Sequence, residues 1–220
     1  MLKKYSVLRD TVAALCAEAV DRTVARNYLI EQEPAVTARI AQRIEDVLSP
    51  IGGGSEYSGL NIDVEVFNVP DRGRRSLEHE TGADLYFGIR VRSPHEHISK
   101  GFWTQAVWAH KLNSARAETL RAQASDMLSR TDKGSFVWIY DPDGVACLPA
   151  SEVVVNERVA PRDLQSINMR NFFGQVIDCF SGDVDFAPDK IFDDRRYLPE
   201  FLASFRSMTA VLVDVKIAGE

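Results

Sequence analysis

Helical spacing is the first pattern along the chain. Apolar side chains recur at intervals of three and four residues over residues 2–26 and again over about residues 33–48, which is the period of an amphipathic helix. The two runs contain Leu8, Val12, Leu15, Ala19 and Val20, and then Val36, Ile40, Ile44, Val47 and Leu48. Pro50 and the glycines that follow it disfavour a helix, so we expect the second run to end there. The sequence therefore predicts two N-terminal helices.

Strand patterns follow the two helices. Ile62, Val64 and Val66 alternate with Asp63 and Glu65, as in a strand with one buried face. Further along we expect strands at 85–91, 102–108 and 136–140, a helix over 114–129, a hairpin strand over 145–148 after the turn 141–144, helices over about 161–180 and 199–206, and a final strand over 211–215. This order predicts one mixed α/β domain.

The predicted domain covers residues 1–220 and has three parts. Residues 1–50 form the N-terminal helices, residues 56–150 form the core sheet with its helix, and residues 160–220 form a C-terminal α/β extension. The sequence leaves open whether this extension completes the core, forms a dimer interface or docks on a larger assembly.

Composition narrows the class of protein. The chain has 220 residues, of which 45% are hydrophobic and 26% charged, as is ordinary for a globular domain. Its apolar stretches are far shorter than the roughly 20 residues that cross a bilayer, and no apolar leader follows the basic N-terminus, so we expect no membrane association. The three cysteines are odd in number and far apart, at Cys16, Cys147 and Cys179. We expect them to be small buried hydrophobes in a reducing compartment, which predicts a cytoplasmic location.

The charge distribution bears on nucleic-acid binding. A net charge of −6 does not favour a protein that is basic throughout, although a basic cleft is compatible with it. Basic residues gather in one part of the sequence, at Arg72, Arg74, Arg75, Arg90, Arg92 and Lys100. We expect them around a functional site, with an ordinary solvated surface as the equal alternative.

The segment with the clearest chemistry contains acids before one strand and an amide in the next. Residues 78–84 read Glu-His-Glu-Thr-Gly-Ala-Asp and end in Asp84, and Gln105 lies in the following strand. Neighbouring strands are about 4.8 Å apart, so one residue from each can reach a common ion. A carboxylate, an amide oxygen and a main-chain carbonyl are the ligands that Mg²⁺ prefers.

These motifs resemble a known family. Gly82-Ala83-Asp84, a hydrophobic strand, a polar loop and the sequence Gly-Phe-Trp-Thr-Gln-Ala ending at Ala106 are similar to the PD-(D/E)XK (restriction-endonuclease-like) nuclease superfamily. The likeness is greatest to its bacterial restriction and defence-associated branch, in which Gln can replace the second acid. It covers roughly residues 30–150, including the helix with Gln123 and the strand 136–140. The resemblance implies a restriction-endonuclease-like mixed central sheet flanked by helices.

The resemblance also implies a function and a set of site residues. It implies a Mg²⁺-dependent (or Mn²⁺-dependent) endonuclease that hydrolyses DNA rather than RNA, in antiphage defence or restriction, as a homodimer or within a larger defence complex. Asp84 and Gln105 would bind the metal with help from the Ala106 carbonyl. Glu33, from an N-terminal helix, and Glu80 would be outer ligands, with Glu78 as an alternative to Glu80.

One residue departs from the family pattern. The family has a lysine two residues after the Gln, where this chain has Val107, and the next lysine is Lys111. In a straight strand Lys111 would lie about 20 Å from Gln105. It can take part in catalysis if the strand ends and the chain turns back; otherwise Lys100 or an arginine must supply the charge.

Three hypotheses follow from these residues. In the first, Asp84, Gln105, Lys111 and Glu33 form a catalytic site. In the second, a degenerate nuclease fold binds nucleic acid or a partner subunit without cutting. In the third, the resemblance is accidental, and Asp84 and Gln105 do not meet in space.

Overall fold

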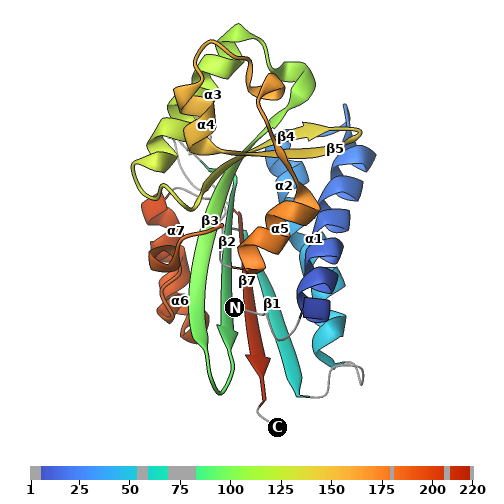
Figure 1. Cartoon of the computed structure of the whole chain (residues 1–220), viewed down its shortest axis with the longest axis vertical. Helices are drawn as coiled ribbons and strands as arrows, with labels where there is room; N and C mark the ends of the chain where they lie inside the picture. The colour runs from blue at the N-terminus through green and yellow to red at the C-terminus, as the bar shows by residue number, and fades with distance from the viewer. Residues whose placement is uncertain (1–5, 54–58, 69–82, 179–180, 206–208, 219–220) are drawn as a thin grey trace.

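The computed structural model describes residues 6–53, 59–68, 83–178, 181–205 and 209–218 (Figure 1). In these residues a seven-stranded sheet has the order β1-β7-β2-β3-β4-β5-β6. The strands are β1 Leu60–Asn68, β2 Leu85–Arg92, β3 His97–Trp108, β4 Ser135–Asp141, β5 Gly144–Pro149, β6 Ile167–Asn168 and β7 Thr209–Ile217. The protein is thus of the mixed α/β class, as the sequence predicted.

Helices cover both faces of the sheet (Figure 1). They are α1 Ser6–Asn27, α2 Glu33–Leu48, α3 Ser114–Leu128, α4 Ala150–Val155, α5 Met169–Ile177, α6 Lys190–Asp193 and α7 Leu198–Phe205. One face packs against α1, α2 and α5. The other is shared, with α6 and α7 over the half that contains β7 and β2 and with α3 and α4 over β4 and β5.

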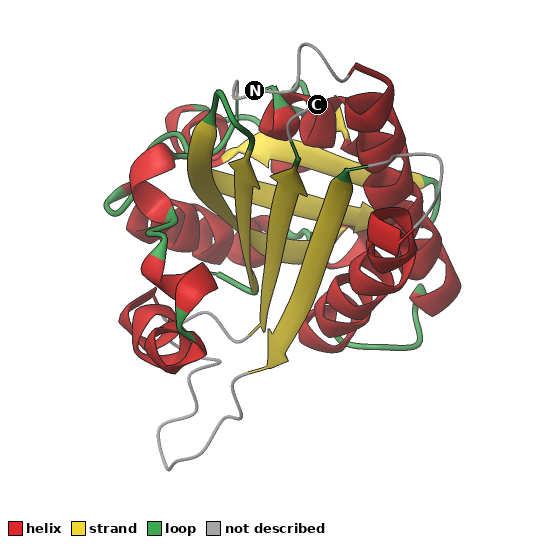
Figure 2. Cartoon of the chain, turned by 90° about the horizontal axis from the view of Figure 1, so that it is seen from below, coloured by secondary structure: helices red, strands yellow, loops and turns green. Residues whose placement is uncertain are grey.

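Strand direction reverses once at the middle of the sheet, between β2 and β3. β2 pairs with β3 as an antiparallel hairpin and with β7 in parallel. β3 and β4 are parallel, joined by a crossover through α3. The sheet twists strongly, so that β4 and β5 run across the direction of β1 and β7 (Figure 2).

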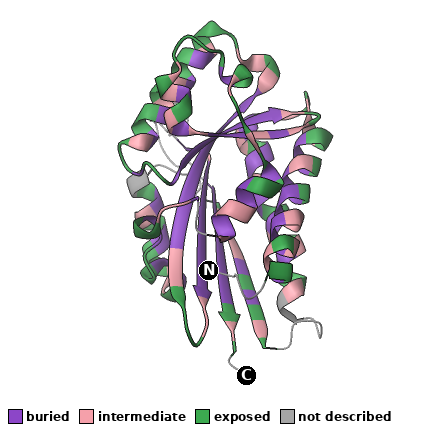
Figure 3. Cartoon of the chain, in the orientation of Figure 1, coloured by how far each residue is buried: buried purple, intermediate pink, exposed green. Residues whose placement is uncertain are grey.

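Three clusters of buried side chains hold these layers together. The largest lies under α1, α2 and α5 and contains an aromatic group in which Phe87 and Phe102 stack with ring centroids 5.0 Å apart. Two smaller clusters lie on the opposite face, one under α6 and α7 and one under α3 and α4. The central strands are buried along most of their length (Figure 3).

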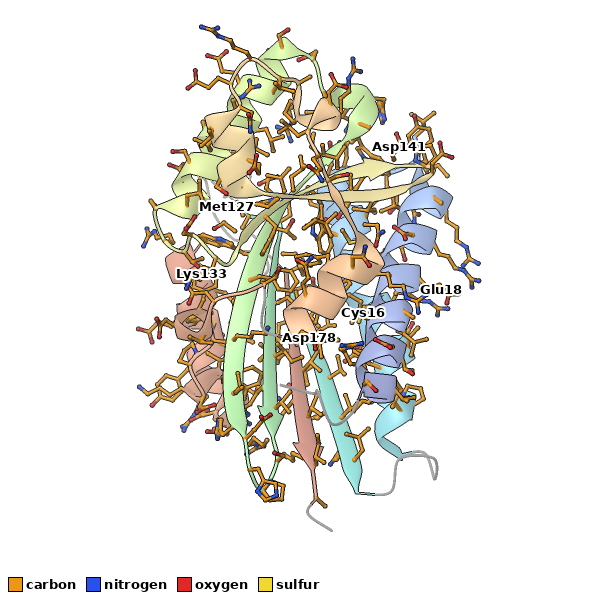
Figure 4. The ribbon with its side chains drawn as sticks, in the orientation of Figure 1. Cys16, Glu18, Met127, Lys133, Asp141 and Asp178 are labelled. Atoms are coloured by element: carbon orange, nitrogen blue, oxygen red, sulfur yellow. The ribbon has the colours of Figure 1, made fainter. Side chains whose placement is uncertain are left out.

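The predicted burial of the cysteines is confirmed for the described residues. Cys16 and Cys147 are free thiols, 1% and 0% exposed, inside the largest apolar cluster. Cys16 lies on the face of α1 that packs inward (Figure 4). Cys179 is outside the described residues.

The order of elements agrees with the sequence analysis, and β7 shows which role residues 160–220 have in the fold, a point that the sequence left open. β7 lies between β1 and β2, so the predicted C-terminal extension is an integral part of the central sheet. Two bounds also differ: β3 begins at His97 instead of residue 102, and the helix expected over about 161–180 is confined to Met169–Ile177.

A buried ion pair ties β7 to its neighbour. Arg90 on β2 lies opposite Asp214 on β7, is 2% exposed, and donates to both carboxylate oxygens of Asp214 at 3.1 and 2.9 Å. Burial alone would raise the pKa of Asp214, but the hydrogen bonds and charges of Arg90 and Arg92 outweigh it and hold that pKa below its usual value.

Asp214→Ala should therefore destabilise the fold. We expect the free energy of unfolding to fall by about 3 kcal/mol, because the substitution leaves the buried Arg90 guanidinium short of its main partner. The control is Asp193→Ala, which removes a second partner of Arg90 whose side chain is 59% exposed and should cost less than about 1 kcal/mol. Urea denaturation measures both. Equal losses for the two variants would contradict this account.

Candidate functional site

β3 extends past the start of β2, and this difference in length creates the site. Leu85, the first residue of β2, pairs with Thr104, so residues 105–108 of β3 have no partner on that side. Their other edge is occupied by β4. The N–H groups of Ala106 and Trp108 point toward the side that β2 does not reach, because alternate amides of a strand face the same neighbour.

Two carboxylates bind these two amides. The N–H of Ala106 donates to Asp84 Oδ2 at 2.7 Å, and the N–H of Trp108 donates to Glu33 Oε1 at 3.4 Å. Asp84 arrives from the residue just before β2, and Glu33 from the first residue of α2. The Trp108 indole N–H also donates to the Glu31 carbonyl at 3.1 Å and so ties the turn before α2 to β3.

Gln105 is bound directly to Asp84. Its Nε2 donates to Asp84 Oδ2 at 2.6 Å and to the Ala106 carbonyl at 3.1 Å. The residue is 4% exposed, and within the described part of the chain its Oε1 is buried without a hydrogen-bond partner. Asp84 and Gln105 therefore meet in space, contrary to the separation that the hypothesis of an accidental resemblance predicted.

Lys111 turns back to the same end of β3. The strand ends at Trp108, and a 3₁₀ turn, η5 Ala109–Lys111, reverses the chain. Lys111 Nζ donates to Glu33 Oε2 at 3.0 Å and to Gln32 Oε1 at 3.1 Å. Of the two arrangements that the sequence left open, the chain adopts the turn, but the lysine pairs with Glu33 and not with Asp84.

The carboxyl group of Asp84 has a strongly shifted pKa. Burial is the largest effect and raises it; the N–H of Ala106 lowers it, the charge of Glu33 raises it and the charge of Arg116 lowers it. The resulting pKa is about 7. Burial therefore sets the direction of the shift at Asp84, and the negative charge of Glu33 acts in the same direction.

A hydroxyl pair supports the Glu33 end of the site. The Thr37 hydroxyl donates to the Glu33 carbonyl at 2.9 Å and lies 2.9 Å from the Tyr140 hydroxyl. Because the Thr37 proton is already used, Tyr140 must be the donor in the second bond. Burial raises the pKa of Tyr140, the hydrogen bond with Thr37 opposes this, and the charges of Asp84 and Glu33 act with burial. Sequence analysis missed both residues, although Thr37 lies one helical turn after Glu33.

Gln105 and Val107 occupy a boundary between two apolar clusters. On the face of β3 that they share, Trp103 belongs to the cluster under α6 and α7, whereas Val107 belongs to the cluster under α3 and α4. Gln105 is the polar residue between them. Val107 is 0% exposed, so the strand position where the family has its lysine is part of the core here.

The predicted basic cluster does not surround the site. Arg90 and Arg92 bind Asp214, and Arg90 lies six residues along β2 from Asp84, or about 20 Å. Lys100 donates to the Ser181 carbonyl at 3.0 Å. The remaining predicted members, Arg72, Arg74 and Arg75, are outside the described residues, as are Glu78 and Glu80. The prediction is therefore wrong for the members that can be placed.

The donor set fits a hard divalent cation. Among the described residues no group of three or more His, Cys, Asp or Glu side chains could hold a metal, so any site here must combine side-chain and main-chain oxygens. The Asp84 carboxylate, the Ala106 carbonyl and the unpartnered Gln105 Oε1 supply such oxygens. The Gln105 amide nitrogen lies between the Asp84 carboxylate and the Ala106 carbonyl. Its positively polarised N–H groups occupy the place that a cation would take. Rotation of this amide would present Oε1 to an ion instead.

None of the described helices is long and apolar enough to span a membrane.

Comparisons of the chain with protein-family models, with curated proteins and with solved structures return no match. The geometry of the site therefore carries the functional argument.

Asp84→Asn should change how stability depends on pH. The pKa of the carboxyl group has its ordinary value of 3.8 in the unfolded chain and is about 7 in the fold. The native state thus keeps a proton that the unfolded state has lost, and the contribution is full below about pH 4 and lost as the pH rises through about 7. The full shift corresponds to about 4 kcal/mol, but the side chain keeps partial exposure. We expect wild type to lose about 2 kcal/mol relative to Asp84→Asn between about pH 4 and pH 8.

Urea titrations across this pH range measure the difference. The matched control is Asp126→Asn, an exposed acid on α3, which should follow the wild-type profile. Parallel pH profiles for wild type and Asp84→Asn would rule out a raised pKa at this position.

Proposed function

We propose that this protein is a Mg²⁺-dependent (or Mn²⁺-dependent) endonuclease that hydrolyses DNA phosphodiester bonds. One observation carries the proposal. Asp84, Gln105 and the Ala106 carbonyl form a single oxygen-rich group joined by hydrogen bonds of 2.6–3.1 Å, and the Glu33–Lys111 pair lies at the same end of β3. Metal-dependent phosphodiesterases need a hard cation site with a nearby charged group for water and phosphate.

The arrangement of elements supports a restriction-endonuclease-like core. The acid comes just before one strand of an antiparallel hairpin and the Gln lies on the other, as in the PD-(D/E)XK pattern. A crossover helix, α3, then leads to the parallel strand β4, and an N-terminal helix contributes Glu33. The bacterial defence or restriction setting, the cytoplasmic location and a homodimer or larger complex follow from the sequence resemblance and composition.

The residues of the site have distinct tasks in this proposal. A bound divalent cation would supply positive charge against a phosphate and acidify water. Asp84, Gln105 and Ala106 would hold it, with the Ala106 N–H fixing the orientation of the Asp84 carboxylate. Glu33 would orient the attacking water, because its carboxylate is held in place by the Trp108 N–H and by Lys111.

The reaction is a hydrolysis that needs no further reactant. Water forms a new bond to phosphorus, one ester P–O bond breaks, and the leaving oxygen takes up a proton. One product carries the phosphate and the other a hydroxyl group.

A second candidate function is a binding module without catalysis. Val107 favours it, since the lysine position of the family pattern is filled by a buried residue of the apolar core. The nearest lysine is engaged by Glu33. In this case the fold would hold nucleic acid or a partner subunit and leave DNA intact.

Asp84→Asn should abolish cleavage. We expect wild-type protein with Mg²⁺ or Mn²⁺ to nick supercoiled plasmid or cut circular single-stranded DNA, and the variant to leave both at background, because the substitution removes the charged metal ligand. Gel assays with and without EDTA measure this, and Asp126→Asn is the control. Wild-type protein that binds these DNAs but leaves them intact with either metal would favour the second candidate.

Lys111→Met should weaken activity without abolishing it. Lys111 holds the Glu33 carboxylate, and loss of such an orienting partner typically costs about 10- to 100-fold in activity or metal affinity. We expect a lower rate and a higher Mg²⁺ concentration for half-maximal cleavage. Lys133→Met, in an exposed loop before β4 (Figure 4), controls for the lost charge. An unchanged metal dependence in Lys111→Met would argue against this role.

A further inference from the structure

A second cationic side chain, that of Arg116, lies near the site, and its charged group is not paired as that of Lys111 is. Lys111 has its ammonium group bound to Glu33 and Gln32. Arg116 is half-buried, and its main-chain N–H donates to Asn113 Oδ1 at 2.9 Å. Within the described residues its guanidinium group forms no hydrogen bond or ion pair.

The turn after β3 fixes where Arg116 lies. η5 is closed by the bond from the Leu112 N–H to the Ala109 carbonyl at 3.2 Å, and the Asn113 N–H donates to the Lys111 carbonyl at 2.9 Å. Asn113 then caps α3 through the N–H of Arg116. Lys111 and Arg116 therefore come from one connected turn at the end of β3 where Asp84 and Glu33 meet the strand.

Arg116 also belongs to the stripe of α3 that faces the sheet. Leu120 and Ala124 follow it at helical spacing, and both pack in the cluster that contains Val107. Side chains four residues apart share one helix face. Val107 and Gln105 share one face of β3, so Arg116 lies on the same side of the sheet as the amide of Gln105.

Two features at this position favour the binding of an anion and a cation side by side. The Arg116 guanidinium lies on the same side of the sheet as the amide of Gln105, and no ion pair or hydrogen bond in the described structure joins it to the Asp84 carboxylate. Its positive charge is therefore available to an anion. Gln105 Oε1, 4% exposed as a residue, lacks a partner in the same place.

We propose that Arg116 binds the phosphate group that is to be cleaved, while Lys111 serves to hold Glu33. This inference rests on the proposed function and assigns separate tasks to the two cations. Arginine suits the task because its planar fork of N–H donors can bind two phosphate oxygens at once. The positive end of α3, which has 15 residues, adds to the attraction for an anion.

DNA binding tests the proposal without requiring cleavage. The probe is a fluorescein-labelled 20-base-pair duplex, and the same sequence as a single strand, titrated by anisotropy with Ca²⁺ in place of Mg²⁺; gels verify that the probe stays intact. Arg116→Gln should weaken binding about 10- to 100-fold and reduce the slope of log affinity against log salt by about 1. Arg116→Lys should keep the salt slope and still bind more weakly than wild type, because it retains the charge without the fork.

Arg130→Gln is the matched control. It removes the same charge just beyond the other end of α3, about 20 Å away, and should bind as wild type does. Thermal melts verify folding, and if Arg116→Gln melts lower, Arg116→Lys decides the result. Equal affinities for wild type, Arg116→Gln and Arg130→Gln would overturn the assignment of Arg116.

The outcome separates this inference from the proposed hydrolysis. Wild-type protein that binds DNA through Arg116 but never cuts it would leave the phosphate site standing and reject the nuclease. Cleavage that Arg116→Gln leaves unchanged in KM and kcat would reject only the phosphate site. Wild-type protein that binds neither probe would overturn both.

Discussion

The site depends on the mismatch in length between β3 and β2. β3 continues for residues 105–108 beyond its pairing with β2, which leaves main-chain N–H groups that must find other acceptors, since a buried unpaired amide is costly. Asp84 and Glu33 are those acceptors. The end of a strand, the start of a hairpin and the start of a helix are thereby joined at one point.

This constraint gives the site its electrostatic character. Burial raises the pKa of Asp84, and the charge of the nearby Glu33 carboxylate raises it further, so that this pKa is about 7. Capping two amides would require only part of the hydrogen-bonding capacity of two carboxylates. Gln105 Oε1 and the Arg116 guanidinium, neither of which has a hydrogen-bond partner in the described part of the chain, are not needed for capping. A metal cation with an anionic ligand bound to it would account for the two carboxyl groups, the Gln105 amide oxygen and the Arg116 guanidinium together.

The parts of the fold that follow local patterns could be predicted from the sequence. The bounds of α2 agree because its apolar spacing and the proline after it are local signals, and Asp84 and Gln105 meet because hairpin pairing places them opposite each other. The position of β7 could not be predicted, because it depends on pairing between strands far apart in the sequence.

The partners of the charged residues could not be predicted from the sequence either. Arg90 was expected at the site, yet its partner Asp214 lies far along the chain and draws it into a structural ion pair. Lys111 reaches Glu33 only because a short 3₁₀ turn ends β3. Arg116 had a readable signal, since it precedes Leu120 and Ala124 at helical spacing, but nothing local indicates that this stripe ends beside Asp84.

A crystal structure of the protein soaked with Mn²⁺ tests the central claim most directly. We expect an anomalous peak about 2.0–2.3 Å from Asp84 Oδ2 and from Gln105 Oε1, with the Gln105 amide rotated so that its nitrogen no longer lies between Asp84 and the Ala106 carbonyl. No peak at this position, with the Gln105 nitrogen still bound to Asp84, would show that these residues only cap the end of a strand.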